Sequence, residues 1–446
     1  MSITDQFVDF ITAAPVENEA AYHITSLSLL DWAAVTIAGM DEPIANIIRS
    51  LVEEECGTQQ AYAAGLSQHV PARAAALVNG TTSHALDYDD THFSYIGHPS
   101  VVVFPAVFAF ADKIGSDMVS IKEAALIGLE TTTRIGVWLG RTHYRTGFHI
   151  TATAGAIGAT AGCSKLLGFS AEQTRTALSL VASMASGVKE QFGTMGKPFH
   201  AGMAASSAVE ACLLAEKGIV SGFDALTGVQ GFGATHHSEE NSFACDGLGK
   251  DWLFTDVSHK FHACCHGTHA MLEALALIKN AHSFALEEVE YIEVFTHPQY
   301  RNVCDIKSPA TGTEAKFSYR LIAAMGLSGI ETARPDCFSD DLCNIPNLIR
   351  LRDLTNVITD DLLSDTQTKV TVNLSNSRKL RSEYDLLDLR APHEREARVR
   401  AKAASLLGRA REEHLWQIIG NVSLAKPSRS FCASLLGVCC QGFSDW

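Results

Sequence analysis

The sequence predicts a mainly α protein with a large all-helical domain and a smaller α/β domain. Residues 1 to about 265 contain one apolar, helix-like segment after another, whereas β-branched and partly alternating segments appear only after about residue 270. A helical pattern then returns in residues 397–421. The length of 446 residues fits two domains, because a typical domain has about 100–200 residues.

Helix boundaries in the first part are marked by capping patterns. Ser120 with Glu123, and Ser170 with Gln173, fit the S/T-x-x-E/Q box, in which side chains bond the unpaired N–H groups at a helix start. Gly218 follows an apolar run, where a helix commonly ends. We therefore expect helices to begin just after the two serines and another to end at this glycine.

Some of these helices consist mostly of small residues. ATAGAIGATAG (152–162) and AGMAASSAVEAC (201–212) place Ala, Gly and Ser on most faces. Such helices can approach one another closely inside a protein, so we expect them in the helical core. The glycines of the first segment follow no strand and lack G-x-G-x-x-G spacing, so they do not predict a dinucleotide site.

The second domain is predicted from two strand-like segments, VEYIEVFTH (289–297) and TKVTVNL (368–374). A helical stretch around residues 314–327 lies between them. The expected division of the chain is a helical domain of residues 1–265, onto which residues 400–446 pack back, and an α/β domain of residues 266–399.

Charge and composition exclude several classes of protein. A formal net charge of −15 argues against general binding to nucleic acid or to an anionic membrane. The longest apolar run, residues 101–111, contains Pro105 and is much shorter than the ~20 residues of a membrane-spanning helix. Asp5 and Asp9 stand where an export signal would carry positive charge, so we interpret the twelve cysteines as reduced thiols of a cytoplasmic protein.

Before residue 100, potentially catalytic side chains are most concentrated in HALDYDDTHFSYIGHPS (84–100), which follows the helix-like ARAAALVNG (72–80). A loop after a helix can direct side chains into a pocket. Three interpretations are open: a catalytic or substrate-orienting wall, a solvated acidic turn, and a metal site, although the spacing fails the calcium-loop pattern. The acidic and imidazole residues of the segment are His84, Asp87, Asp89, Asp90, His92 and His98.

Two further residues stand at predicted helix starts. His149 directly precedes the first small-residue helix, where the helix dipole disfavours a charged imidazole, and this suits a neutral base. Lys197 lies between Gly196 and Pro198, beside the free N–H groups of a helix start, and this suits a carboxylate site. The alternatives are a hydrogen-bonded structural histidine and a solvated lysine.

The segment HKFHACCHGTHAML (259–272) concentrates histidines and cysteines. If it is helical, His262, His266 and His269 share one face. It can then bind a metal or line a cleft. Zinc sites usually show two separated ligand pairs, and the segment lacks them, so we predict that no metal is required.

The order and surroundings of these segments resemble the MmgE/PrpD family, which includes 2-methylcitrate dehydratases and cis-aconitate decarboxylases. The resemblance covers nearly the whole chain. It implies a large helical domain with a smaller α/β lid, a homodimer, and an enzyme without an organic cofactor. Its most specific parts are residues 79–100, 147–168, 196–218 and 259–275.

The resemblance also implies which residues form the site. Two positions depart from the decarboxylase pattern, since Cys265 stands where those enzymes have a histidine and Leu321 where they have a tyrosine. The residues expected in the site are, for catalysis, Asp87, His98, His149, Lys197 and His269, and, for substrate binding, Thr91, Arg145, Cys265 and His266.

Within this family, the chain resembles an epimerase of the iminodisuccinate type, in overall likeness and in its compact length. Such an enzyme removes a proton α to a carboxylate of a small anionic polycarboxylate and returns a proton to the opposite face. The alternative is a dehydratase or decarboxylase of a tricarboxylate that resembles 2-methylcitrate or cis-aconitate. A non-catalytic polycarboxylate-binding or scaffold protein is the remaining class.

Overall fold

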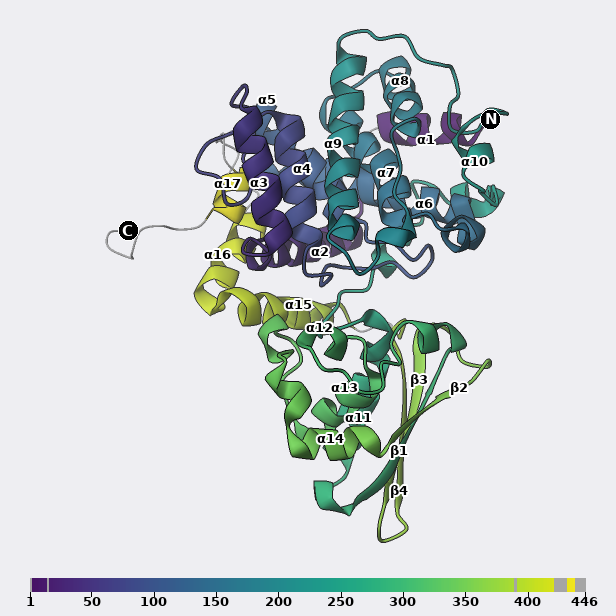
Figure 1. Cartoon of the computed structure of the whole chain (residues 1–446). Coiled ribbons are helices and arrows are strands. Elements are labelled where there is room, and N and C mark those ends of the chain that lie inside the picture. The colour runs from purple at the N-terminus through teal and green to yellow at the C-terminus, as the bar shows by residue number, and fades with distance from the viewer. Residues whose placement is uncertain (1, 14–15, 389–390, 421–430, 438–446) are drawn as a thin grey trace. The chain divides into compact units, whose positions relative to one another are not determined.

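The computed structural model describes residues 2–13, 16–388, 391–420 and 431–437 (Figure 1). The chain divides into two compact units. The first comprises Met1–His259 and Leu406–Trp446, and the second comprises Lys260–Ser405. Residues 260–265 and 400–405, which we expected with the helical domain, thus group with the second unit.

The first unit is helical throughout its described regular structure, and the protein is mainly α, as predicted. Helix α7 lies at the centre of this unit, because its residues 150–164 are all buried and α5, α6 and α9 pack around it. The helices are α1 (Ile3–Thr12), α2 (Glu19–Ala38), α3 (Pro43–Glu55), α4 (Ala72–His84), α5 (Ser100–Ile114), α6 (Met118–Thr146), α7 (Ile150–Leu166), α8 (Ala171–Ala182), α9 (Gly196–Glu216), α10 (Phe232–Thr235), α16 (Arg409–Gly420) and α17 (Phe431–Leu436).

Small residues allow these helices to cross closely, as the sequence predicts. A Cβ atom added to Gly158 of α7 would lie 1.9 Å from Thr132 Oγ1 of α6. A Cβ atom on Gly80 of α4 would lie 2.8 Å from the Cα atom of Gly202 of α9. Larger side chains would push these helices apart, so the small-residue segments position the helix ends described below.

Two of the three predicted helix boundaries are confirmed. Ser170 and Gln173 form a complete capping box at α8, and α9 ends just before Gly218, whose φ is +82°. The expected box at Ser120 is wrong. The Oδ1 atom of Asp117 instead accepts the backbone N–H of Ser120 at 2.7 Å, and α6 begins at Met118, because the earlier aspartate caps the same N–H groups.

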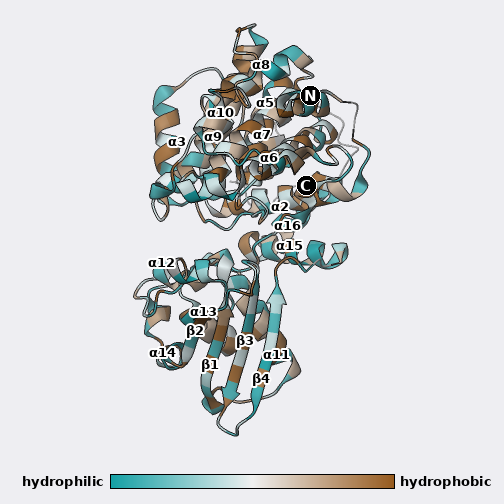
Figure 2. Cartoon of the chain, turned by 90° about the vertical axis from the view of Figure 1, so that its right-hand side faces the viewer, coloured by the Kyte–Doolittle hydropathy of each residue, from teal (hydrophilic) through white to brown (hydrophobic). Residues whose placement is uncertain are grey.

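The second unit contains a mixed four-stranded sheet in the order β2-β1-β3-β4. Strand β1 (Val289–Thr296) pairs in parallel with β2 (Thr355–Thr359) and antiparallel with β3 (Gln367–Leu374), which pairs antiparallel with β4 (Lys379–Asp385). The predicted strands correspond to β1 and β3. The sequence pattern missed β2 and β4, which lie at the sheet edges, and β4 is largely hydrophilic (Figure 2).

Helices cover one face of this sheet, which Figure 2 shows with the strands toward the viewer. Helix α11 contacts β3 and β4, whereas α13 and α14 contact β2. The helices of the unit are α11 (His269–Ala281), α12 (Gly312–Ala315), α13 (Tyr319–Ser328), α14 (Pro346–Asp353) and α15 (Pro392–Leu407).

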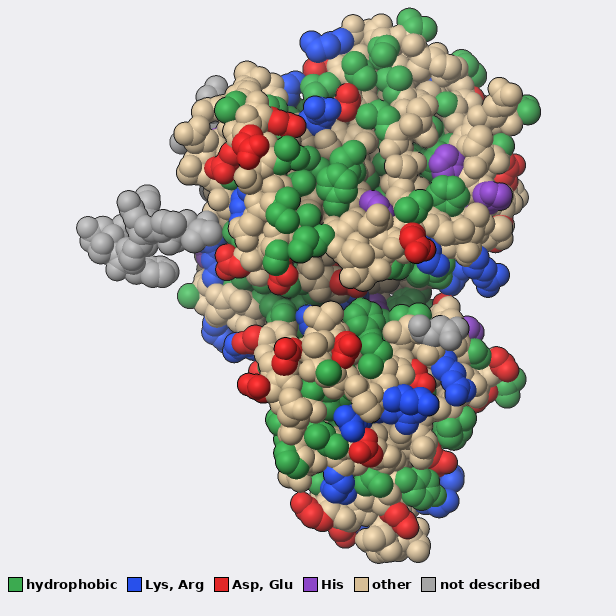
Figure 3. All heavy atoms as spheres, in the orientation of Figure 1, with side chains coloured by type: hydrophobic (Ala, Val, Ile, Leu, Met, Phe, Trp, Pro, Cys, Tyr) green, Lys and Arg blue, Asp and Glu red, His purple; other side chains and the backbone are tan. Residues whose placement is uncertain are grey.

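Two surface properties bear on the excluded classes of protein. No helix among the described residues is long and apolar enough to cross a membrane. Acidic and basic side chains are interspersed on the visible face of each unit, so the net charge of −15 does not form one continuous patch there (Figure 3).

Candidate active site

Four helix ends in the first unit carry candidate site residues. His84 is the last residue of α4 and leads into the loop that contains the aspartates. His98 lies two residues before α5, His149 is the N-cap of α7, and Lys197 is the second residue of α9. Three of these ends are N-terminal ends, where the unpaired N–H groups carry partial positive charge and attract anions.

Asp89 joins two of the histidines. Its Oδ1 atom lies 2.9 Å from His84 Nδ1, and its Oδ2 atom lies 2.8 Å from His98 Nδ1. The Asp89 and His84 side chains are fully buried. Burial opposes ionisation of Asp89, but the two imidazoles outweigh it and hold the pKa of this carboxyl well below its usual range. Asp89 is therefore a fixed negative charge that orients both rings.

Asp87 joins the same loop to α9. Its Oδ2 atom lies 2.8 Å from Lys197 Nζ, and its Oδ1 atom lies 3.7 Å from His98 Nε2. The backbone of Asp87 adopts φ +49°, a left-handed conformation that is uncommon outside glycine but tolerated by aspartate. This conformation turns the loop so that Asp87 and Asp89 both face His98.

His98 consequently lies between two carboxylates, one at each ring nitrogen. Its backbone N–H donates to Thr151 Oγ1 at 3.1 Å, which attaches it to the first turn of α7. A carboxylate at each ring nitrogen orients the imidazole, so His98 is held in position for proton transfer.

His149 has the opposite environment. Its Nδ1 atom lies 3.1 Å from His200 Nδ1, and its ring packs edge-on against Phe192. Burial, together with the nearby His84 and Lys197, holds the pKa of His149 well below its usual range. The ring is therefore neutral near pH 7 and suited to accept a proton.

Two buried imidazole nitrogens in this cluster have no hydrogen-bond partner within the described protein. They are Nε2 of His84 and Nε2 of His149, and the two rings stack with centroids 5.9 Å apart. A buried polar atom without a partner is costly, and such atoms are expected where a ligand completes the hydrogen bonds. Both nitrogens are thus available to a polar substrate.

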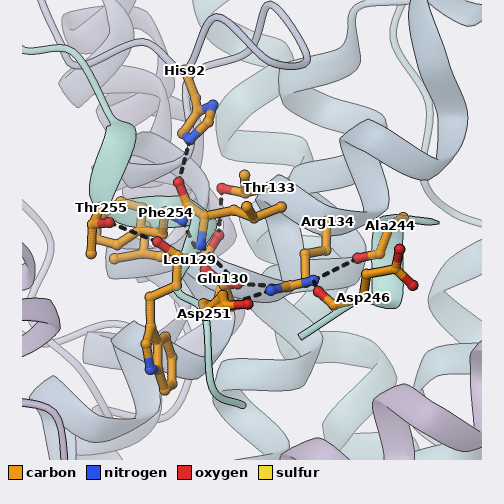
Figure 4. A network of polar contacts seen from close by, with 12 residues as sticks. His92, Leu129, Glu130, Thr133, Arg134, Ala244, Asp246, Asp251, Phe254 and Thr255 are labelled. Atoms are coloured by element: carbon orange, nitrogen blue, oxygen red, sulfur yellow. Dashed lines mark hydrogen bonds and ion pairs between the residues drawn. The ribbon is translucent and has the colours of Figure 1, made fainter. Parts of the chain in front are cut away.

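The loop that carries His98 is anchored on a buried ion pair (Figure 4). His92 Nε2 lies 2.7 Å from the carbonyl oxygen of Leu253, whose N–H donates to Glu130 at 3.1 Å. Glu130 in turn binds Arg134 Nε at 2.5 Å. Thr91 is buried in the same loop, and its backbone exchanges two hydrogen bonds, of 2.9 and 2.8 Å, with Ser258. These contacts fix the loop on α6.

The structure brings together four of the sequence-predicted residues, namely Asp87, His98, His149 and Lys197. The fifth, Thr91, lies in the loop that carries Asp87 and His98. Arg145 is not part of this cluster. This arginine is exposed at the C-terminal end of α6, where its charge acts on Glu239. Three residues of the cluster were not among the expected site residues, namely His84, Asp89 and His200, although the sequence singled out the segment that contains the first two. The first two belong to the H-x-x-D-x-D pattern, which could have indicated them, whereas His200 lies one helical turn after Lys197.

The remaining predicted residues lie in the second unit. Residues 262–265 are not helical, so the expected shared helix face is wrong: a 3-10 turn covers His266–Thr268 and α11 begins at His269. The rings of His262 and His266 nevertheless approach the ring of His269, with centroids 5.0 and 4.6 Å away. Burial, followed by these two histidines, holds the pKa of His269 well below its usual range.

The two positions that depart from the decarboxylase pattern also lie in this unit. Leu321 is buried in α13. Tyr319, two residues earlier, donates its hydroxyl hydrogen to the carbonyl oxygen of Gly267 at 2.6 Å. Cys265 is half-buried directly before the 3-10 turn.

A metal ion is compatible with part of the cluster in the first unit. His84, Asp87, Asp89 and His98 each offer one ligand atom, all within 4.8 Å of one another. However, the Lys197 ammonium already neutralises Asp87, and Asp89 already binds two imidazole nitrogens. A divalent cation would have to compete with these contacts, and the expected independence from metal remains a prediction.

The first unit thus combines a helical fold with imidazoles, two carboxylates and an ammonium at helix ends, and these groups can carry out acid–base chemistry on an anion. The chain belongs to the MmgE/PrpD family. The family sequence model for the MmgE/PrpD N-terminal domain matches residues 5–244, and the one for the MmgE/PrpD C-terminal domain matches residues 262–423.

The chain is similar to several curated relatives. It is 29% identical over 290 residues to the cis-aconitate decarboxylase-like protein oryM of Aspergillus oryzae, covering 60% of each chain. It is 30% identical over 275 residues to the cis-aconitate decarboxylase of Homo sapiens, covering 58% of this chain and 56% of the relative. It is 29% identical over 231 residues to that of Aspergillus terreus, covering 47% and 46%. The matches therefore span about half of the length of these relatives.

Proposed function

We propose that this protein is a lyase that acts on a small tricarboxylate of the cis-aconitate kind by acid–base chemistry, without an organic cofactor. The curated relatives support this reaction class, which was the alternative to the expected epimerase. The observation that carries the proposal is that His98, held between Asp87 and Asp89, accompanies a buried and neutral His149.

The site suits a substrate with several carboxylates. Lys197 supplies a positive charge at the start of α9, and the N-terminal ends of α5, α7 and α9 add partial positive charge. One substrate carboxylate would replace part of the Lys197–Asp87 contact. Electrostatic stabilisation of this kind is strongest for charge that develops during the reaction.

The two histidines divide the proton transfers. In decarboxylation, the electron pair of the broken carbon–carbon bond moves into the substrate, and the carbon that receives the charge must gain a proton. We assign that proton to His98 because Asp89 and Asp87 hold its ring in position. In dehydration, the neutral His149 would remove a proton from carbon and His98 would protonate the departing hydroxyl group.

An epimerase of the iminodisuccinate type is the second candidate. Cys265 and Leu321 depart from the decarboxylase pattern in the second unit, while the cluster in the first unit retains a proton donor and a proton acceptor. Epimerisation needs such a pair on opposite faces of one carbon.

A substrate panel tests the proposal. The full chain would be incubated separately with cis-aconitate, a 2-methylcitrate and a chiral amino-dicarboxylate. Release of carbon dioxide indicates decarboxylation, a change in alkene absorbance indicates hydration or dehydration, and loss of optical rotation without a change in mass indicates epimerisation. Either of the first two supports the lyase. Only the third would support the epimerase, and binding without turnover would indicate the non-catalytic class.

Assembly and location are part of the same proposal. We infer a homodimer in the cytoplasm, because the family resemblance implies pairing and the cysteines of the described residues form no disulfides. Light scattering of the purified chain at micromolar concentration tests the dimer.

A further inference from the structure

Two thiols of the second unit lie against each other. The Sγ atoms of Cys265 and Cys304 are 3.1 Å apart, and the thiol of Cys304 donates to Cys265. This separation is about 1 Å longer than an S–S bond of ~2.05 Å, so small side-chain rotations would close it. Neither residue takes part in the proton transfers proposed for the first unit.

Backbone hydrogen bonds fix the positions of the two cysteines. The N–H of Cys265 donates to the carbonyl oxygen of Lys316 at 3.0 Å, and the N–H of Cys304 donates to that of Tyr300 at 2.8 Å. The carbonyl oxygen of Cys304 accepts the N–H of Tyr319 at 2.9 Å, and the hydroxyl of Tyr319 binds Gly267. The proximity of the sulfur atoms is therefore built into the backbone of both segments.

The two thiols have different access to solvent. Cys265 is half-buried, so a small oxidant can reach it, whereas Cys304 is fully buried. Cys265 also directly precedes the 3-10 turn that leads into α11, and it accepts a hydrogen bond from Cys304. The bond with Cys265 and burial raise the pKa of Cys304 well above its usual range, so it remains a protonated thiol.

The adjacent Cys264 is not part of this pair. Its Sγ atom lies 3.2 Å from the hydroxyl oxygen of Thr268, within its own turn. Burial raises the pKa of Cys264 to about 12, and its thiol is engaged with Thr268 rather than with another sulfur atom. The three cysteines thus have distinct predicted reactivities despite their closeness.

We propose that Cys265 and Cys304 form an oxidation site that converts to an intramolecular disulfide when the protein meets a hydroperoxide. The Cys265 thiolate attacks one peroxide oxygen, the O–O bond breaks, and Cys265 becomes a sulfenic acid while the other oxygen leaves and is protonated to an alcohol or water. The Cys304 sulfur then attacks the sulfenic sulfur, its proton goes to the departing hydroxide, and water leaves. Two thiols are oxidised and one peroxide is reduced.

Peptide mapping tests this site in the full chain. The reduced protein is treated with hydrogen peroxide, its remaining thiols are alkylated, and it is digested with trypsin without reduction. The expected product joins peptide 261–279 to peptide 302–307, with the mass of two hydrogen atoms missing, and dithiothreitol separates the two. Recovery of Cys265 and Cys304 as separate alkylated residues after peroxide treatment would overturn the proposal.

Three variants assign the bond, since peptide 261–279 contains both Cys264 and Cys265. Cys264→Ala, the matched control, should still form the cross-link, whereas Cys265→Ser should not. Cys304→Ser should leave Cys265 as a sulfenic acid that dimedone labels. A cross-link that persists in Cys265→Ser, or disappears in Cys264→Ala, would contradict the assignment. The outcome is independent of the proposed function because the readout is the covalent bond.

Discussion

The Nζ atom of Lys197 lies 2.8 Å from Oδ2 of Asp87. This ion pair connects the start of α9 to the loop after α4, and through Asp87 it reaches His98. The positive charge is thereby placed beside the proton donor rather than spread over the surface. A substrate carboxylate bound at Lys197 would lie next to the group that donates the proton.

Lys197→Ala should reduce both substrate affinity and turnover. Loss of a partly buried cation that stabilises developing charge costs about 2–4 kcal/mol, or ~30- to ~800-fold in kcat/KM. Lys217→Ala is the matched control, because Lys217 is exposed at the other end of the same helix. Steady-state kinetics check the prediction, and near-parental kcat/KM in Lys197→Ala would remove this lysine from the site.

Asp89→Asn should lower stability and activity together. The substitution leaves His84 and His98 without their shared buried carboxylate, and removal of one member of a buried ionic network typically costs about 3–5 kcal/mol. Chemical denaturation measures the change in the free energy of unfolding. His84→Gln should cost less, since Asp89 keeps its contact with His98. Equal losses in the two variants would show that Asp89 does not act as the bridge.

Asp90→Asn should change the pH dependence of stability. Burial, and then the negative charge of Asp31, raise the pKa of Asp90 to about 7. A folded-state pKa above the unfolded value means that stability from this group is present below pH ~4 and is lost as the pH rises through about 7. The asparagine variant does not titrate. Its Tm relative to the parent should therefore rise between pH 5 and pH 8, by roughly 2–4 °C for each kcal/mol involved.

The Tm difference between Asp90→Asn and the parent isolates this effect, because other carboxyls titrate in both proteins. Scanning calorimetry at pH 5, 6.5 and 8 supplies the values. A difference that is constant over this range would mean that Asp90 is ionised in the folded protein.

Chelation should leave activity unchanged. The ligand atoms of the His84, Asp87, Asp89 and His98 group already contact one another or Lys197, so a metal ion would have to displace these contacts. Elemental analysis of the active protein, followed by kinetics after dialysis against a chelator, checks this. Stoichiometric metal, with activity lost on chelation and restored by the same metal, would refute it.

The sequence predicts the parts of the fold that depend on local pattern. The small-residue run before Leu166 predicts a buried α7 with His149 at its start, and the β-branched segments predict β1 and β3. It does not predict β2 and β4, since edge strands can be polar and need no alternating apolar face. The helix start predicted at Ser120 is wrong because another capping residue, Asp117, lies one turn earlier.

The site is less predictable because its contacts are not local. His84 and His98 share Asp89 in a loop in which Asp87 has a left-handed backbone, and spacing alone reveals neither feature. The contact between His149 and His200 depends on how α7 packs against α9. Residue type therefore identified the candidates, while tertiary packing decided their partners.

One measurement tests the central claim most directly: incubation of cis-aconitate with the protein in deuterium oxide, with carbon dioxide and the deuterium content of the product recorded for the parent and for His98→Gln. The account predicts carbon dioxide release and one deuteron bound to carbon in the product of the parent. It predicts a rate lower by roughly 10²-fold or more in the variant, which keeps the size but loses the titrating ring. No carbon dioxide from cis-aconitate, or an equal rate in His98→Gln, would contradict it.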